Sequence, residues 1–333
     1  MRENKVVYGL IGYGGMGRWH TEILSNVPEA VIGGIYDIKE EKREEAKEKG
    51  FSVYETEEAM LADSDIDVVL IATPNDCHKP IAIRAMHAGK NVISEKPVTL
   101  SSADLLEMEK VAKETGKLFT VHQNRRWDDD FLIIKKLVEE QKLGHVFRIE
   151  SRVHGSRGIP GDWRKEKVHG GGMVLDWGVH LLDQILYMYG DRKIETVYAS
   201  LTNITNQEVD DGFTAILTFE GGTEVLVEVG TNNYISLPRW YVLGKDGTAV
   251  IRDWQLTGEI IRKTGKTEET VIPVKTAAGL TKTMAPRRED TIVKEDLPKV
   301  SGDIADFHRN VVALIRDGAE PAVSYTHLRA HET

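Results

Sequence analysis

Two side chains that could do acid–base chemistry lie four residues apart in an apolar stretch. The segment GGGMVLDWGVHLLDQ, residues 170–184, has the pattern of a buried helix but contains Asp176 and His180. On an α-helix, residues four apart point to the same side, with Cβ atoms about 6 Å apart. An acid beside an imidazole can move a proton or hold a hydroxyl group, so the pair is a candidate catalytic site, although it could instead only hold the helix in place.

A metal site is not expected from this pair. Asp176 and His180 could each ligate zinc, but no third ligand and no His-Glu motif accompany them. We therefore predict no metal.

A glycine-rich turn near the N-terminus matches a dinucleotide-binding pattern. The letters GYGGMG give G-x-G-x-x-G spacing between a predicted strand at 6–12 and a predicted helix at 15–25. These glycines permit a tight turn and a close approach, so a pyrophosphate can sit on the amides at the helix N-terminus. We expect cofactor contacts from the whole turn, namely Gly12, Tyr13, Gly14, Gly15, Met16 and Gly17.

Asp37 ends the second predicted strand, twenty residues after Gly17. A carboxylate at this position can accept hydrogen bonds from the ribose hydroxyls and repels a 2′-phosphate, which favours NAD over NADP. Asp37 could also cap the following helix, and Lys39 keeps NADP possible.

Two further segments follow predicted strands at the edge where such sheets bind ligands. In ATPNDCHKP, residues 72–80, Thr73 and Asn75 could contact ribose or phosphate, although Asn75 could instead cap the next helix. In SEKPVTLS, Pro97 biases Lys96 toward an extended conformation, although this could be a solvated strand end. The remaining cofactor contacts expected at this edge are Pro74, His78, Glu95 and Lys96.

Composition excludes several classes of function. The chain has 333 residues, 41% hydrophobic and 29% charged, as in a globular protein of about two domains. Its net charge of −10 disfavours binding to nucleic acid or an anionic membrane. No apolar run reaches the roughly 18 residues of a membrane span, and the N-terminus has no secretory pattern. The one cysteine, Cys77, excludes an intrachain disulfide, and we expect a cytoplasmic protein.

The order of predicted elements divides the chain into two domains. Strands and helices alternate up to residue 123, which indicates a parallel sheet covered on both faces. A helix at 128–140 and the Asp176/His180 helix follow, then strands with short glycine turns, which indicate an antiparallel sheet. These strands are expected at 144–154, 194–204, 210–220, 223–231, 237–244 and 258–273. The predicted domains are 1–123 and 124–323, with a loop at 275–300 and a last helix at 301–317.

The last ten residues have an unusual origin. SYTHLRAHET, residues 324–333, is similar to the translation of a transposase adapter used in DNA sequencing. We interpret it as an artefactual tail, expect the native protein to continue past about Val323, and assign no function to His327 or His331.

Taken in order, G-x-G-x-x-G, A-T-P-N, E-K-P and G-G-G-x-x-x-D-x-G-x-H resemble the glucose–fructose oxidoreductase/inositol dehydrogenase (Gfo/Idh/MocA) family from residue 5 to about 320. The segment VHQNRRWDDDF, residues 121–131, is similar to its scyllo-inositol dehydrogenase-like branch. The resemblance implies a Rossmann domain followed by an α/β domain with an open, mostly antiparallel sheet. It also implies hydride transfer between a nicotinamide and a sugar or polyol carbon.

The resemblance also assigns residues and partners. It implies catalytic roles for Lys96, Asp176 and His180, and places Trp163 and Arg164 near the nicotinamide. We expect substrate contacts from Lys96, Asn124, His154, Trp163, Asp176 and His180. Family members associate through the second sheet, which implies a homodimer or homotetramer.

The substrate stays open at this point. The loop at 154–172 departs from the inositol branch, so the resemblance does not carry inositol specificity over. The leading hypothesis is an NAD(P)-dependent dehydrogenase of a cyclic polyol, sugar or sugar derivative. The alternatives are a dehydrogenase of the C3 position of glycosides or nucleotide sugars, and a cofactor-binding sugar sensor without catalysis.

Overall fold

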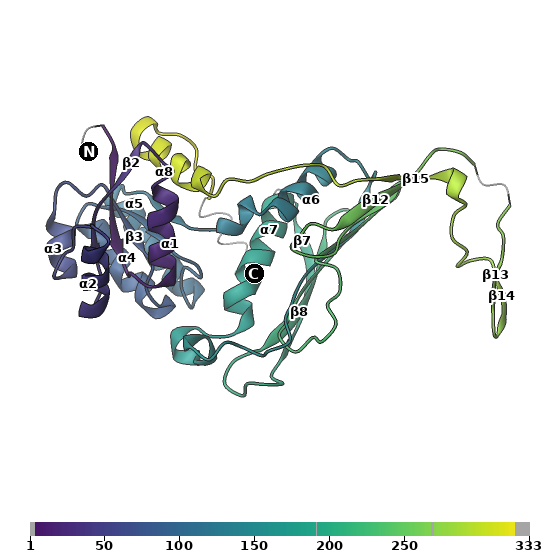
Figure 1. Cartoon of the computed structure of the whole chain (residues 1–333), viewed down its shortest axis with the longest axis horizontal. Coiled ribbons are helices and arrows are strands. Elements are labelled where there is room, and N and C mark those ends of the chain that lie inside the picture. The colour runs from purple at the N-terminus through teal and green to yellow at the C-terminus, as the bar shows by residue number, and fades with distance from the viewer. Residues whose placement is uncertain (1–3, 191, 268–269, 324–333) are drawn as a thin grey trace.

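Two main sheets organise the chain in the computed structural model, which describes residues 4–190, 192–267 and 270–323. A five-stranded parallel sheet lies toward the N-terminus and an eight-stranded mixed sheet follows it (Figure 1). The predicted fold class, a Rossmann domain plus an open, mostly antiparallel sheet, is confirmed.

The parallel sheet has the strand order β2-β1-β3-β4-β5. Its strands are β1 Val6–Ile11, β2 Ala30–Tyr36, β3 Val68–Ile71, β4 Asn91–Ser94 and β5 Phe119–Val121. All six residues of β1 are buried, as expected for a strand covered on both faces. The chain order reverses between β1 and β3, and ligands of such sheets bind at the carboxyl ends of the strands beside that point.

Helices cover both faces of this sheet. They are α1 Gly15–Leu24, α2 Glu40–Glu48, α3 Glu57–Ala62, α4 His78–His87 and α5 Ser102–Thr115. The apolar residues of α3, α4 and α5 pack on one face, and those of α1 pack on the other. The last helix, α8 Ala305–Asp317, returns to this second face, where Phe307 and Val311 join the core of the parallel sheet (Figure 1).

The second sheet has the order β15-β12-β11-β10-β6-β9-β8-β7, and only the β6–β9 pair is parallel. Its strands are β6 Val146–His154, β7 Ile194–Thr202, β8 Gly212–Phe219, β9 Thr223–Gly230, β10 Trp240–Gly244, β11 Gly247–Ile251, β12 Gly258–Lys263 and β15 Ile292–Glu295. Helices α6 Asp129–Glu139 and α7 Val179–Tyr189 pack their apolar sides onto one face of it. Helix α7 therefore lies between the two sheets (Figure 1).

Several predicted elements differ from the observed ones. The strand expected at 258–273 ends at Lys263, and β11 and α3 were not predicted. The expected loop at 275–300 contains β15 and most of the hairpin β13 Val274–Thr276 and β14 Gly279–Thr281. These elements are short, and β15 is fixed by pairing with β12 rather than by its own periodicity. The tail at 324–333 lies outside the described residues.

Among the described residues, no helix combines the length and the apolar character that crossing a membrane requires.

Candidate functional site

Each glycine of the turn after β1 has a distinct steric role. Gly12 has a φ of 98°, and a Cβ there would lie 2.5 Å from the carbonyl oxygen of Ala72. A Cβ on Gly17 would lie 2.1 Å from the carbonyl oxygen of Gly12. A Cβ on Gly14 or Gly15 would meet nothing within 4 Å. The first and third glycines are therefore required by close packing, while the middle of the turn leaves open space.

This open space lies at the N-terminus of α1. Gly14 is the N-cap without a side-chain hydrogen bond, and the first turn contains no acidic residue. The first amides of the helix therefore remain available to an anion, and the helix dipole favours negative charge there. Tyr13 is buried and Met16 is 37% exposed. The turn thus fits a dinucleotide pyrophosphate in both space and charge.

Asp37 lies where the ribose of such a cofactor would be recognised, directly after β2. Its carboxylate accepts hydrogen bonds from the backbone N–H groups of Tyr13 at 2.7 Å and Lys39 at 2.9 Å. A carboxylate offers about four lone-pair sites, so two remain for hydroxyl groups. Asp37 does not cap the next helix, whose N-cap is Lys39.

Two side chains of the segment after β3 have backbone partners in neighbouring loops. Asn75 is 4% exposed and its amide donates to the carbonyl oxygens of His169 at 3.1 Å and Gly170 at 3.3 Å. The ring nitrogens of His78 lie 2.9 Å from the carbonyl oxygens of Thr73 and Pro97. Asn75 and His78 thus hold neighbouring loops, whereas Thr73 and Pro74 lie at the sheet edge beside the turn.

Lys96 and Asp176 meet across the gap between the two sheets. The Lys96 Nζ lies 3.3 Å from Asp176 Oδ1 and 3.2 Å from the Asp176 carbonyl oxygen. The other carboxylate oxygen accepts from Arg164 Nε at 3.1 Å. The Lys96 and Asp176 side chains are only 15% and 13% exposed, so water screens this ion pair weakly. The structure therefore brings these two predicted catalytic residues together.

Asp176 and His180 do not share one regular α-helix. Residues Val174–Gly178 form a π-helical turn, and α7 begins only at Val179. Among the described residues, no hydrogen bond joins Asp176 to His180, because the carboxylate is occupied by Lys96 and Arg164. A π-helical turn is rare and frequently marks a functional site. The expected pairing of Asp176 with His180 is thus replaced by a pairing with Lys96.

His180 is a neutral imidazole close to two cations. Its side chain is 4% exposed, and its Nδ1 has no hydrogen-bond partner among the residues that the structure describes. Burial, followed by the positive charges of Lys96 and Arg125, lowers the pKa of His180 well below its usual range. A neutral imidazole with a free lone pair can accept a proton.

This lowered pKa predicts a dependence of stability on pH. The charge of Glu95 raises the pKa of His180 and that of His122 lowers it, and the net shift of the His180 pKa is downward. Below about pH 6.5 the unfolded chain binds a proton at this histidine while the folded chain does not. The free energy of unfolding therefore decreases as the pH is lowered. Wild-type protein should lose stability as the pH is lowered from about 6.5 to 5, and His180 should contribute about 1.4 kcal/mol per pH unit to this slope. We expect His180→Asn to lack that contribution. Urea unfolding at several pH values measures the slope.

The control for this measurement is His87→Asn, which changes an exposed histidine at the end of α4. It should leave the wild-type slope unaltered. Identical slopes for His180→Asn and wild type would contradict the assignment of a depressed pKa to His180.

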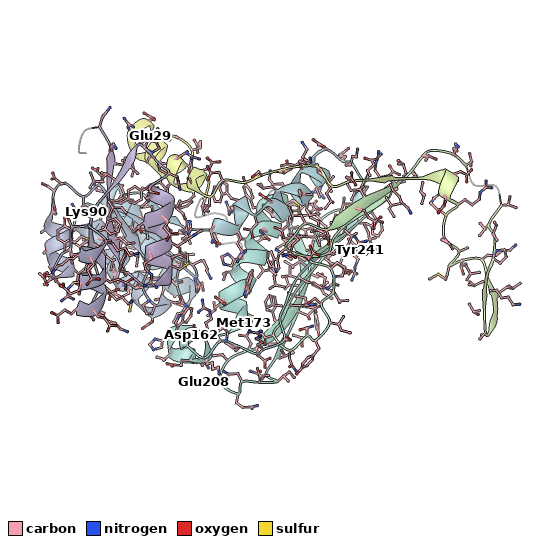
Figure 2. All side chains as sticks on the ribbon, in the orientation of Figure 1. Glu29, Lys90, Asp162, Met173, Glu208 and Tyr241 are labelled. Carbon is pink, nitrogen blue, oxygen red and sulfur yellow. The ribbon has the colours of Figure 1, made fainter. Side chains whose placement is uncertain are left out.

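Trp163 and Arg164 lie on a short helical turn that closes the site from one end. The Asp162 carboxylate caps this turn and pairs with Arg164 at 2.8 Å. The Arg164 guanidinium lies 4.6 Å from the centre of the Trp163 ring while its Nε contacts Asp176. Figure 2 shows Asp162 close to Met173 and Glu208, at one end of the second sheet. Arg164 thus contacts Asp176 directly, and Trp163 is linked to Asp176 through Arg164.

The structure does not bring His154 to this site. Its ring lies 2.7 Å from Glu228 of β9 and accepts from the backbone N–H of Leu237. In β6 the alternate residues Ile149 and Val153 face α7 in the core, so His154 points to the opposite face of the sheet. Asn124 lies at the end of β5, and its Oδ1 is buried without a partner among the described residues.

Arg125, Trp177 and Trp254 were not predicted as site residues. The Arg125 guanidinium lies 4.1 Å from the Trp177 ring centre and 5.6 Å from that of Trp254. A cavity of about 310 Å³ opens beside them, lined by Arg125, Trp127, Asp128, Asp129, Asp130, Trp254 and Leu256. Burial raises the pKa of Asp128 despite the nearby Arg125. Only the Arg-Arg-Trp run at 125–127 gave a local signal, because Trp254 comes from a loop far along the chain.

A second cavity of about 300 Å³ lies on the other side of the π-helical turn. Its walls come from the segment after β4 and from the opposite side of α7, including Leu100, Gln123, Leu175 and Leu182. None of Lys96, Asp176 and His180 lines either cavity.

Comparison with known proteins places this arrangement in context. A family model described as an oxidoreductase family with an NAD-binding Rossmann fold matches residues 6–123, and a GFO/IDH/MocA C-terminal domain model matches residues 131–250. The chain is 49% identical to an NAD-binding protein from Listeria innocua of known structure. That superposition has a TM-score of 0.93 and covers 99% of this chain and 96% of the other.

Among the curated relatives with named activities are two inositol dehydrogenases and the glucose-6-phosphate 3-dehydrogenase of Bacillus subtilis, which is 29% identical over 60% of this chain and 59% of its own length. The scyllo-inositol 2-dehydrogenase (NADP(+)) IolW of Bacillus subtilis is 28% identical over 93% of this chain and 86% of its own length. The myo-inositol 2-dehydrogenase of Thermotoga maritima is 30% identical over 64% of this chain and 65% of its own. Matches to several uncharacterised oxidoreductases span about half of those proteins' length.

Proposed function

Because the chain belongs to the Gfo/Idh/MocA family of NAD(P)-dependent oxidoreductases, we propose that it oxidises a CH–OH group of a cyclic polyol, sugar or sugar derivative. The observation that carries the proposal is the contact of Lys96 with Asp176 at 3.3 Å, beside the neutral His180. A site that only bound the cofactor would not need a cation, a carboxylate and a free imidazole at the same edge.

The cofactor would be held by the glycine turn and Asp37. Gly14 and Gly15 leave space for the pyrophosphate, and the free lone pairs of Asp37 can accept from the ribose hydroxyls. When bound, the nicotinamide supplies the acceptor or donor of the hydride. We propose NAD as the preferred form. Asp37 would repel a 2′-phosphate, and the nearby Arg43 is already bonded to the carbonyl oxygens of Asp37 and Ile38.

The remaining half of the reaction is a proton transfer by the chain's own residues. Oxidation of an alcohol carbon releases a hydride and, from the hydroxyl oxygen, a proton. We assign the proton to His180, whose imidazole is neutral, and a hydrogen bond to the same oxygen to the Lys96 ammonium. Asp176 orients Lys96 through their ion pair. In the exchanged assignment Lys96 is the proton acceptor, and its ammonium group would first have to lose a proton.

The surroundings of the site favour a neutral, polyhydroxylated substrate. Trp254 offers an apolar ring face, while Arg125 and Asp128 offer hydrogen-bonding groups, in the wall of the cavity of about 310 Å³. Apolar ring faces with a few placed polar groups are typical of small-molecule sites. The relatives that act on inositols support this substrate class without fixing one compound.

The test is a spectrophotometric scan of the purified protein. Reduced nicotinamide would be followed with NAD or NADP against inositols, aldoses, anhydrosugars and glycosides. Reduction by one class, lost in Lys96→Ala, would support the dehydrogenase. Silence across the panel with intact cofactor binding would contradict it and favour a sugar sensor.

The choice of cofactor is testable at Asp37. Replacing it with serine removes the negative charge that would face a 2′-phosphate, so the preference for NAD should fall by at least about tenfold. The ratio of kcat/KM for NAD and NADP measures this preference. Asp65→Ser, on an exposed loop of the same domain, is the control. An unchanged ratio in Asp37→Ser would contradict the assignment.

We also propose, from the family resemblance, association of copies through the second sheet. Its edge strand β7 exposes Val197, Tyr198 and Leu201, each more than half exposed. Exposed apolar side chains on a strand are unfavourable in a monomer. Sedimentation equilibrium should give a dimer or tetramer, and Tyr198→Lys should shift it toward monomer. A monomeric wild-type protein would contradict the proposal.

A further inference from the structure

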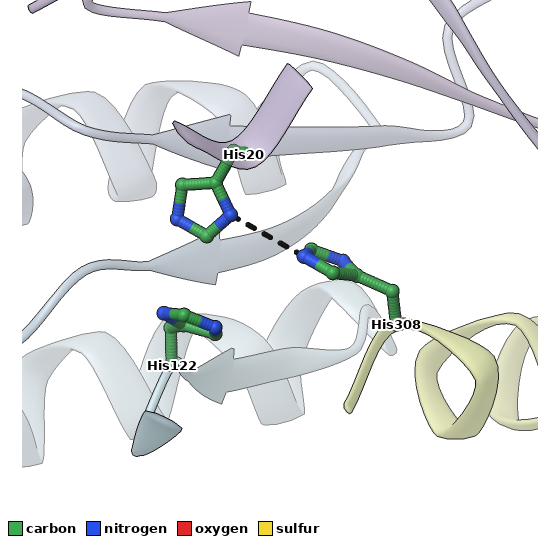
Figure 3. Close-up of side chains that lie close together, drawn as sticks. All are labelled: His20, His122 and His308. Carbon is green, nitrogen blue, oxygen red and sulfur yellow. Dashed lines mark hydrogen bonds between the residues drawn. The ribbon is translucent and has the colours of Figure 1, made fainter. Parts of the chain in front are cut away.

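Three buried histidines that the proposed reaction does not use lie together behind Lys96. His20 comes from α1, His122 directly follows β5, and His308 comes from α8 (Figure 3). All three are fully buried, and one nitrogen from each lies within 4.8 Å of the others. Three segments distant in sequence thus converge through the same type of side chain.

A single carboxylate orients two of these rings. Glu95 Oε1 lies 2.8 Å from His20 Nε2 and 2.9 Å from His122 Nδ1. Glu95 is 5% exposed, and its other carboxylate oxygen accepts from the backbone N–H of Lys96 at 3.1 Å. A carboxylate accepts hydrogen bonds, so each ring nitrogen that faces it acts as a donor. In the neutral tautomers of these rings the lone pairs lie on the opposite nitrogens, His20 Nδ1 and His122 Nε2.

The third ring lies on the side of these lone pairs. His308 Nε2 is 3.3 Å from His20 Nδ1, the contact drawn as a dashed line in Figure 3. Two nitrogens bound to one tetrahedral zinc ion are separated by about 3.3 Å, given Zn–N bonds of about 2.0–2.1 Å. His122 Nε2 is buried and has no partner among the described residues. A buried lone pair without a donor is unfavourable, and a metal ion would satisfy it.

We propose that His20, His122 and His308 form a binding site for a divalent transition metal ion such as Zn²⁺. The ligand atoms are His20 Nδ1, His122 Nε2 and His308 Nε2. Binding moves the proton of His308 from Nε2 to Nδ1 and draws the His122 ring inward by up to about 1.5 Å, since the present separations reach 4.8 Å.

The position of Glu95 supports this assignment. Histidines that bind metals almost always donate their other ring N–H to a carboxylate or carbonyl oxygen, which fixes the tautomer. Here one carboxylate does so for two rings.

The proposed ion would have a structural role. It would link the helix that begins at the glycine turn, the last strand of the parallel sheet and the returning helix α8. We assign it no step in hydride transfer, because among the described residues the Lys96 Nζ hydrogen-bonds to Asp176 and to none of the three histidines. Its presence therefore does not depend on the proposed function.

The test uses tag-free, full-length protein refolded from denaturant without metal, since the site is buried. Refolding with Co²⁺ should produce the visible absorption bands of a tetrahedral nitrogen site, saturating at one equivalent. Zn²⁺ should abolish the bands by competition and raise the midpoint of thermal unfolding by several degrees. Absence of the bands and of the thermal shift in the wild-type protein would overturn the proposal.

Variants identify the ligands. His308→Gln should lose the Co²⁺ bands and the Zn²⁺ shift, and was chosen because His308 does not contact Glu95 in the hydrogen-bond network. His87→Asn, an exposed histidine on α4, should keep both. Should His308→Gln fail to fold, X-ray absorption on the Co²⁺-loaded wild type counts imidazole ligands directly. Fewer than three, or bands that survive in a folded His308→Gln, would overturn the assignment.

Discussion

Lys96→Ala is expected to lower kcat by about 10²–10⁴-fold while leaving the fold and cofactor binding intact. The Lys96 Nζ is the cation nearest the proposed reacting oxygen, and its contacts are to Asp176. Its side chain is 15% exposed at the edge of the site, so truncation opens space to water rather than a dry cavity. Asp176 keeps its contact with Arg164 and is not left as an unpaired charge. Steady-state kinetics with the substrate found in the scan measures the loss.

The matched control is Lys110→Ala, a 73% exposed lysine on α5. It should have wild-type kcat, since an exposed pair such as Lys110 with Glu114 contributes little. Cofactor affinity, measured by quenching of tryptophan fluorescence, should be the same in all three proteins. A Lys96→Ala enzyme within tenfold of wild-type kcat would remove Lys96 from the proposed mechanism.

The glycine turn could be predicted because its requirements are local. The spacing of Gly12, Gly14 and Gly17 follows from a strand, a turn and a helix that are adjacent in the chain. The family resemblance named Lys96 and Asp176, which are eighty residues apart, but did not predict their contact. Neither periodicity nor composition carries such a contact.

Other roles depend on contacts that the local sequence does not contain. Asn75 holds a loop more than ninety residues away, so its pattern alone could not separate a cofactor contact from a structural one. The π-helical turn around Asp176 has no sequence signal, and we have no physical account of it from the residues alone. His154 is different. The alternation of Ile149 and Val153 in a predicted strand was sufficient to place it on the opposite face.

The largest effect on cofactor binding is expected from Gly17→Ala. The new Cβ would lie 2.1 Å from the carbonyl oxygen of Gly12. Neither this carbonyl group nor the backbone of residue 17 can move away without opening the turn. Alanine favours helix by about 1 kcal/mol over glycine, but such overpacking typically costs about 1–3 kcal/mol. We expect a lower midpoint of thermal unfolding and a Kd for NAD at least about tenfold higher. Calorimetric titration and thermal unfolding give both values.

Gly15→Ala separates weaker NAD binding caused by a destabilised turn from weaker binding caused by loss of space for the pyrophosphate. Its Cβ meets nothing within 4 Å, so the methyl group does not disturb the protein and adds helix propensity. It would, however, occupy the space proposed for the pyrophosphate. Gly15→Ala should therefore keep or raise the thermal midpoint while weakening NAD, whereas Gly17→Ala should lose both. Gly155→Ala, also in open space but away from the turn, should change neither. If Gly15→Ala bound NAD as tightly as wild type, the pyrophosphate could not lie at the N-terminus of α1.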